Sequence, residues 1–287
     1  MANSSETPDT KQFDVIIIGG GLAGLTLANS LINNQNNNQK HKIALIEAKN
    51  MNLLKNNNNL DNHKNSHLDN RYIALSLNSK ILLEDINIWR NLSNKATPIQ
   101  NIEVSDQGGF GKTYLSSEKE KLPALGYNLR ISDLGEALIN NIKNIKIFEN
   151  TRVTNIKSNI KNNQNNISEL ILNDSQNNSQ KISGKLIIAT DGANSTARNL
   201  LDLKAETKSY NQHAIITTIQ LKREHTDTAY ERFTPDGPIG LIPCIINNKK
   251  NQMSLVWATT EQKAKQLTQI SKKDFLEKLQ IEFGYKC

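Results

Sequence analysis

The chain has 287 residues, 37% of them hydrophobic, which is enough for one large domain or two closely packed domains with a real core. The formal charge of +7 suits a nucleic acid, an anionic membrane or an anionic cofactor, but scattered lysines favour an ordinary solvated surface. Cys244 and Cys287 lie far apart without metal-ligand spacing, which argues against a disulfide framework or zinc site and for a reducing, cytoplasmic setting.

Residues 1–12 are polar and lack the apolar core of a signal peptide, so they are expected to form a disordered tail. No apolar run approaches the roughly 18 residues that span a bilayer, so the protein is expected to be soluble or peripheral. His63 and His67 lie in an asparagine-rich stretch without helical periodicity, which favours surface histidines over metal ligands.

The first periodic segment is a glycine motif between a strand and a helix. Val15–Ile18 is a β-branched run typical of a buried strand, and it leads into Gly19, Gly21 and Gly24, which fit G-x-G-x-x-G. Leu22–Leu31 then follows with the pattern of a helix. Such glycines allow a sharp turn and a close backbone approach to a pyrophosphate, while the helix N-terminus supplies partial positive charge.

A second strand, Lys42–Glu47, ends on an acid 23 residues after Gly24. This is close to where an acidic residue accepts hydrogen bonds from an adenosine ribose. A glycine motif alone is weak, but strand, glycines, helix, strand and terminal acid in this order predict a dinucleotide site.

The middle of the chain is predicted to contain two helices, each with an arginine near its start. Arg71 opens a helix-spaced segment to Ile86, where a cation opposes the helix dipole, so either a bound phosphate or plain solvent exposure explains it. Arg130 precedes a second helix, capped by Ser132 or Asp133 with Glu136 completing a capping box. Between them, two short strands are expected within 100–120.

The run Lys185–Ala189 is another buried strand, preceded by a hairpin of strands at 151–156 and 167–172. It ends in Asp191-Gly192, followed by Ser195 as a helix cap. This places a carboxylate and a flexible turn beside the first glycine motif. An ordinary turn before a capped helix remains the alternative.

From residue 214 the pattern changes to alternating strands separated by turn signals, then to helices near 261–267 and 272–283. The predicted organisation is an α/β nucleotide-binding domain at 13–205, with inserted strands at 100–120. A mainly antiparallel sheet domain follows at 206–287.

Several stretches carry a family resemblance. D-G-x-x-S-x-x-R after G-x-G-x-x-G resembles the class A flavoprotein aromatic hydroxylases, with the Rossmann-like fold of p-hydroxybenzoate hydroxylase. RYIALSLNSKILLEDINIW, LGYNLRISDL, ERFTPDGPIGLIPC and SLVWATTEQ are similar to the ubiquinone-biosynthesis members, the polyprenyl-phenol monooxygenases. The resemblance spans the chain from about residue 13.

The resemblance implies FAD contacts at Gly19, Gly21 and Gly24 (pyrophosphate), Glu47 (ribose), Arg71 and Arg130 (phosphate and ribityl region), Val153 (backbone near adenine), and Asp191 and Gly192 (FAD and NAD(P)H). Ser195 and Arg198 complete that last motif structurally, and Gly237, Pro238, Leu241 and Pro243 border the substrate side of the flavin. It names no catalytic acid or base and no metal ligand, because the cofactor carries the chemistry.

The implied reaction uses FAD, NAD(P)H and O2 to hydroxylate a polyprenyl phenol, by a protein at the cytoplasmic face of a membrane or in a ubiquinone-biosynthesis complex. No later glycine precedes an aspartate, so the family's Gly-Asp stretch has no match, and the chain is expected to correspond to the N-terminal three-quarters of such an enzyme. A flavin-dependent reductase, and an inert remnant or subunit needing a separate C-terminal piece, remain alternatives. A nucleic-acid binder is disfavoured, because the basic residues form no stripe interleaved with aromatics.

Overall fold

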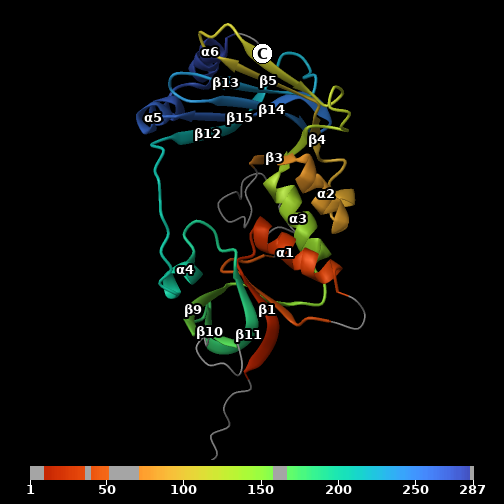
Figure 1. Cartoon of the computed structure of the whole chain (residues 1–287). Helices are drawn as coiled ribbons and strands as arrows, with labels where there is room; N and C mark the ends of the chain where they lie inside the picture. Colours follow the sequence, from red (N-terminus) through yellow and green to blue (C-terminus); the bar gives the residue numbers. More distant parts are fainter. Residues whose placement is uncertain (1–9, 36–39, 52–70, 158–166, 285–287) are drawn as a thin grey trace, which may run out of the picture. The chain divides into compact units, whose positions relative to one another are not determined.

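The computed structural model describes residues 10–35, 40–51, 71–157 and 167–284. The chain divides into two compact units. Figure 1 labels most of the helices and strands. Unit 1 comprises Met1–Asp69 and Leu134–Glu206, and unit 2 comprises Asn70–Asp133 and Thr207–Cys287. Each unit is therefore made of two separate stretches of the chain, whereas the sequence prediction has a single boundary near residue 205. His63, His67 and residues 1–9 of the predicted tail lie outside the described residues.

Unit 1 contains a six-stranded sheet in the order β8-β2-β1-β11-β10-β9. Its strands are β1 (Lys11–Ile18), β2 (Ile43–Ile46), β8 (Lys146–Phe148), β9 (Thr151–Lys157), β10 (Ser168–Asp174) and β11 (Ser179–Ala189). Its helices are α1 (Leu22–Asn33), α3 (Ile131–Asn141, whose first turn is counted with unit 2) and α4 (Thr196–Leu200). The strands β8, β2, β1 and β11 run parallel, and β9 and β10 form the predicted antiparallel hairpin.

The centre of this sheet is apolar on both faces. Ile16, Ile17, Ala44 and Leu45 have no exposed surface, as β-branched and aliphatic runs in central parallel strands require. On one face, α1 is joined to α3 through buried Asn29, whose Nδ2 donates to Leu138 O at 3.0 Å.

Two strand boundaries differ from the sequence prediction. β11 begins at Ser179 and not at Lys185, because its polar first half pairs with β10 while its apolar second half pairs with β1. Lys11 and Gln12, which the sequence prediction places in the tail, belong to β1, where they pair with Ile182 and Ser183. Pairing with neighbours, rather than local hydrophobicity, extends both strands.

Unit 2 is built on a second six-stranded sheet in the order β12-β15-β14-β13-β5-β6, beside a three-stranded sheet β3-β7-β4. The large sheet comprises β5 (Asn101–Asp106), β6 (Lys112–Ser116), β12 (His213–Gln220), β13 (Thr228–Phe233), β14 (Ile239–Ile246) and β15 (Lys249–Thr259). The small sheet comprises β3 (Tyr72–Ser76), β4 (Thr97–Ile99) and β7 (Gly126–Arg130). Only β13 and β5 pair in parallel within the large sheet, which confirms the mainly antiparallel prediction.

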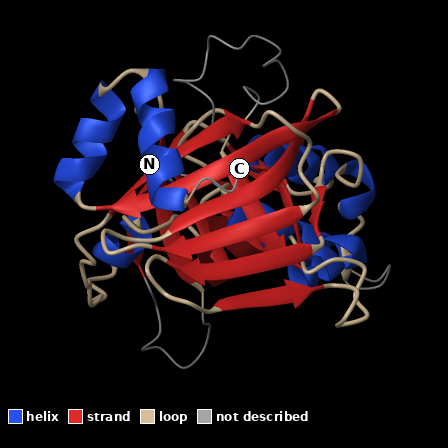
Figure 2. Ribbon diagram, turned by 90° about the horizontal axis from the view of Figure 1, so that it is seen from above, coloured by secondary structure: helices blue, strands red, loops and turns tan. Residues whose placement is uncertain are grey.

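α5 (Glu261–Gln269) and α6 (Lys272–Phe283) pack on one face of the large sheet. Figure 2 shows the strands in red and the helices in blue, seen from above. Leu241, Leu255 and Trp257 from the strands pack there against Leu279 and Phe283 from α6. Side chains alternate across a strand, so the intervening residues lie on the opposite face.

Unit 2 also contains α2 (Leu77–Asp85) and a 3₁₀ helix (Trp89–Asn91). The prediction that Arg71 begins a helix was wrong, because Tyr72–Ser76 forms β3 through pairing with β7, and Ser76 caps α2 by accepting from Ser79 N. The predicted cap of α3 was also displaced. This helix begins at Ile131, so Asp133 lies in its first turn and pairs with Lys95 at 2.8 Å.

Candidate functional site

A tight glycine turn connects β1 to α1. Gly19 has φ of +103°, and a Cβ there would lie 2.6 Å from the carbonyl oxygen of Thr190. A Cβ at Gly24 would collide with the carbonyl oxygen of Gly19. Both positions therefore require glycine, one for backbone conformation and one for close packing of helix and strand.

The N-terminus of α1 is open. Gly21 is the N-cap residue, no side chain caps this end, and the first turn contains no acidic residue. A Cβ at Gly21 would meet no atom within 4 Å. The first N–H groups of a helix lack intrahelical acceptors and carry partial positive charge, so this end suits an anion such as a phosphate.

Glu47 follows directly after β2 and is only 8% exposed. Its Oε2 accepts a hydrogen bond from Gly20 N at 2.7 Å, and its Oε1 accepts one from Lys49 N at 2.9 Å. The parallel pairing of β1 and β2 brings the carboxyl ends of the two strands together. The carboxylate is thereby fixed beside the glycine turn.

Asp191 lies just beyond the end of β11, where its carboxylate caps α4. Oδ1 accepts from Ser195 Oγ at 2.6 Å and Oδ2 from Ala197 N at 3.0 Å. Burial by itself raises the pKa of Asp191, but these hydrogen bonds outweigh it and hold the pKa below its ordinary value. Ser195 accepts from Arg198 N, and Arg198 donates to Ala193 O. The D-G-x-x-S-x-x-R motif therefore caps α4 through hydrogen bonds among its own residues.

These groups surround one cleft of about 460 Å³. Its lining comprises Ile18, Gly19, Gly21, Ile46, Glu47, Ala48, Lys49, Thr151, Arg152, Val153, Thr154, Thr190, Asp191, Gly192 and Thr196. The prediction that Asp191 lies beside the first glycine motif is confirmed. Buried Val153 in β9 lies at the same cleft, with the cationic side chains of Lys49 and Arg152 nearby.

Two further residues shape the turn and were missed in the sequence. Gly20 supplies the N–H group that holds Glu47, and Thr190 Oγ1 contacts the carbonyl oxygens of Ile18 and Gly19, each at 2.9 Å. The run of three glycines, and the hydroxyl residue between strand end and Asp191, were the available signals.

Arg71 and Arg130 belong to unit 2, where the pairing of β3 with β7 brings them together. The carbonyl oxygen of Arg71 accepts from Ile131 N at 2.9 Å. Arg130 Nε donates to Tyr72 Oη at 3.0 Å, and the guanidinium lies over that ring. Burial raises the pKa of Tyr72, and Arg130 only partly offsets this effect. The role of both arginines toward a cofactor stays a prediction.

The predicted substrate-side segment lies at the turn before β14 and within that strand. Gly237 has φ of +134°, and Pro238 O accepts from Ala258 N at 2.9 Å. Leu241 is 1% exposed in the core beneath the helices, and Pro243 pairs with Met253 on that same face. Leu241 therefore packs β14, the strand that contains most of the predicted segment, against the helices.

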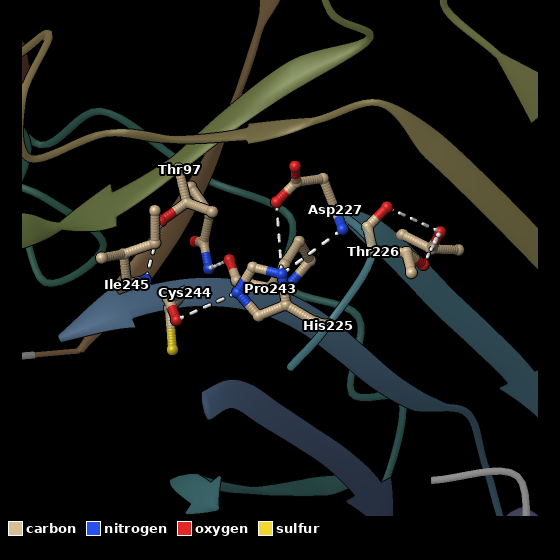
Figure 3. A network of polar contacts seen from close by, with 9 residues as sticks. Thr97, His225, Thr226, Asp227, Pro243, Cys244 and Ile245 are labelled. Atoms are coloured by element: carbon tan, nitrogen blue, oxygen red, sulfur yellow. Dashed lines mark hydrogen bonds and ion pairs between the residues drawn. The ribbon is translucent and has the colours of Figure 1, made fainter. Parts of the chain in front are cut away.

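A polar network pins the irregular end of β14, where the register shifts between Cys244 and Ile246 (Figure 3). Thr97 Oγ1 accepts from Ile245 N at 2.9 Å, and His225 Nε2 lies 3.3 Å from Cys244 O. Asp227 N donates to His225 Nδ1 at 3.3 Å, and Asp227 Oδ1 lies 3.2 Å from the same ring nitrogen. The His225 side chain is 2% exposed and contacts the backbone at Cys244 and Asp227, which supports a structural role.

Comparison with proteins of known sequence gives several relatives. The chain is 28% identical over 297 residues to "Ubiquinone biosynthesis monooxygenase COQ6, mitochondrial" of Dictyostelium discoideum, covering 94% of this chain and 57% of that protein. It is 25% identical to "Ubiquinone hydroxylase UbiL" of Rhodospirillum rubrum, covering 96% and 58%. The chain thus spans a little over half the length of these relatives.

Solved structures show the same fold at low identity. PqsL of P. aeruginosa, described as a probable FAD-dependent monooxygenase, was solved with 2-aminobenzoylacetate and superposes with a TM-score of 0.70 at 16% identity. That match covers 94% of this chain and 67% of PqsL. The flavin-dependent halogenase CmlS gives 0.66 at 15% identity, covering 95% and 46%. These likenesses confirm the predicted α/β fold class.

The sequence family that matches is described as an FAD binding domain. The match runs over residues 12–286, from the first strand through both units. The glycine turn, the open helix end and the acid after β2 lie within it, as do Asp191 and the sheet of unit 2. The chain belongs to this FAD binding domain family.

Proposed function

We propose that the cleft of unit 1 holds the adenosine diphosphate part of FAD. The open N-terminus of α1 would bind the pyrophosphate, Glu47 the ribose, and the backbone at Val153 the adenine. The observation that carries this is the uncapped helix end beside an ordered carboxylate, with no atom in the space that a Cβ at Gly21 would enter. We extend the assignment to Asp191 and Gly192 in unit 1, and to Arg71 and Arg130 in unit 2.

The proposed reaction is hydroxylation of the aromatic ring of a polyprenyl phenol in ubiquinone biosynthesis. The names of the relatives support this class of reaction. Bound FAD would take reducing equivalents from NAD(P)H and activate O2, which are tasks of the cofactor itself. The protein would orient the phenol and exclude water, with the segment from Gly237 to Pro243 on the substrate side.

A polyprenyl tail partitions into a bilayer, so we place the reaction at a membrane surface, with the protein peripheral on its cytoplasmic side or in a biosynthetic complex. The described helices include none that is long and apolar enough to cross a membrane. The formal charge of +7 would favour anionic lipid.

Coupled turnover tests the proposal. The purified chain is reconstituted with FAD, supplied with NADH or NADPH and a geranyl-substituted phenol, and assayed for nucleotide oxidation and for product mass under oxygen-18 gas. One labelled oxygen atom in the ring supports a monooxygenase. Nucleotide oxidation without label in the product supports a flavin-dependent reductase, and failure to retain FAD contradicts the cofactor assignment.

A further inference from the structure

Glu231 lies in β13, the strand labelled in Figure 1. Tyr230 packs in the core beneath the helices, so strand alternation puts Glu231 on the face opposite α5 and α6. Its neighbours in the strand, Tyr230 and Arg232, lie on the helix side. Tyr230 packs in the core, and Arg232 Nε donates to Glu282 O of α6 at 3.0 Å. In register with Glu231 are Gly240 of β14 and Val104 of β5.

Among the described residues, no donor reaches the Glu231 carboxylate, and burial alone raises its pKa. Two other acids on this sheet and its helices have cationic partners. Glu103 pairs with Lys112 at 3.0 Å and Glu282 with Lys263 at 2.9 Å. A half-buried carboxylate without a hydrogen-bond partner destabilises the folded protein, so its presence at this position calls for an explanation.

Gly240 provides the space for this carboxylate. A Cβ at Gly240 would lie 3.2 Å from Glu231 Oε2, and its other near neighbours belong to Val256 of β15. The carboxylate therefore lies over the bare backbone of β14. Any larger residue at Gly240 would push it away from the sheet.

Apolar side chains lie next to Glu231 on this face, with Asp106 and Ser254 further along the neighbouring strands. Val104 and Val256 flank the pair formed with Gly240. Phe233, two residues along β13, is 49% exposed, and Ile216, opposite Val256, is 37% exposed. Glu231 thus presents a hydrogen-bond acceptor beside apolar side chains, which complements an apolar ring bearing a hydroxyl group.

We propose that Glu231 accepts a hydrogen bond from the hydroxyl group of the aromatic substrate, while the neighbouring apolar side chains contact the ring. This inference rests on the proposed function, since it names the residue that selects a phenol for that reaction. The uncharged phenol would donate its hydroxyl proton in a charge-assisted hydrogen bond, and the Glu231 carboxylate would keep its negative charge.

Paired ligands test this assignment on the FAD-reconstituted chain. The probes are a geranyl-substituted phenol and its methyl ether, which differ in the hydroxyl donor. We expect the wild-type protein to bind the phenol about tenfold more tightly than the ether, because only the phenol donates a hydrogen bond to the charged carboxylate. Calorimetry measures both affinities. Glu231→Leu should abolish this preference, and Glu231→Gln should keep part of it. Glu103→Leu, which changes an acid on the helix side of the sheet, should leave it unchanged.

An infrared difference spectrum adds a readout independent of turnover. Phenol binding should shift a carboxyl band that Glu231→Gln removes, and Gly240→Ala should reduce the shift by displacing the carboxylate. Equal affinity for phenol and ether in wild type that retains FAD overturns the inference and leaves the proposed function standing. Loss of FAD overturns the proposed function instead, while the ligand pair still decides the role of Glu231.

Discussion

The Glu47 carboxylate accepts a hydrogen bond from the backbone N–H of Gly20 at 2.7 Å, joining the end of β2 to the turn after β1 across 27 residues of sequence. The same side chain therefore orders the glycine turn and lines the cleft. A carboxylate offers about four acceptor positions, so backbone and ligand contacts are compatible on one group.

Replacing Glu47 by Arg should weaken FAD retention by at least about tenfold, because two acceptor oxygens are lost and bulk enters the cleft. Flavin fluorescence during gel filtration and dialysis measures the retained fraction. Glu47→Gln, which keeps the shape, should give an intermediate loss. Glu206→Arg makes the same charge change at an exposed site in unit 1 and is the control. Equal flavin content in all four proteins would contradict the ribose assignment.

Gly21→Ala and Gly24→Ala should separate binding from folding. The Gly21 variant should keep its Tm and lose FAD affinity, because its methyl group enters only the open space at the helix end. The Gly24 variant should lose about 1–3 kcal/mol of stability, because its methyl group overlaps the Gly19 carbonyl oxygen. Thermal unfolding without flavin, followed by FAD titration, distinguishes the two. An unchanged FAD affinity in the Gly21 variant would rule out phosphate binding there.

The stability difference between wild type and an Asp191→Asn variant should depend on pH. Its folded pKa lies below the ordinary value of 3.8, so its contribution is fully present above that value and is lost as pH falls through the folded pKa. Asp191→Asn should therefore cost about 1 kcal/mol near neutral pH, by weakening the charged cap of α4, and progressively less at acid pH. Denaturant titrations at several pH values measure the difference, and a gap that widened on acidification would contradict the ionised cap.

The Cys244 thiol should be unreactive in the folded protein. Burial raises the pKa of Cys244 to about 12, and the nearby Arg130 offsets only part of this effect. In a Cys287→Ser variant, which leaves Cys244 alone, a thiol reagent at pH 8 should react only upon unfolding in guanidinium. The double variant Cys244→Ala, Cys287→Ser supplies the background, and rapid labelling of native protein would disprove the burial of this thiol.

Membrane association should depend on anionic lipid. The formal charge of +7 and the proposed lipid-soluble substrate lead us to expect flotation with anionic liposomes, weakened by salt, and little with zwitterionic ones. Vesicles of both compositions, with and without the geranyl-substituted phenol, provide the comparison. An absence of binding under every condition would indicate a soluble substrate or an additional partner.

The sequence alone determined the elements whose signals are local. The glycine spacing after a buried run, the alternation from residue 214 onward and the capping residue Ser195 each act within a few positions, so turn, strands and cap were readable. The position of Asp191 beside the glycine turn was also predictable, because parallel strands bring their carboxyl ends to one edge.

Only the tertiary structure decided the features that depend on distant partners. Tyr72–Ser76 has residues at helical spacing, yet it forms a strand because β7 offers its backbone groups. Residues 101–116 join the C-terminal sheet because β5 pairs with β13, which comes much later in the chain. The environment of Glu231 likewise follows from strand register, since Gly240 and Val104 become its neighbours only when β13 is paired on both sides. Backbone pairing and burial are non-local, and no pattern within a single segment encodes them.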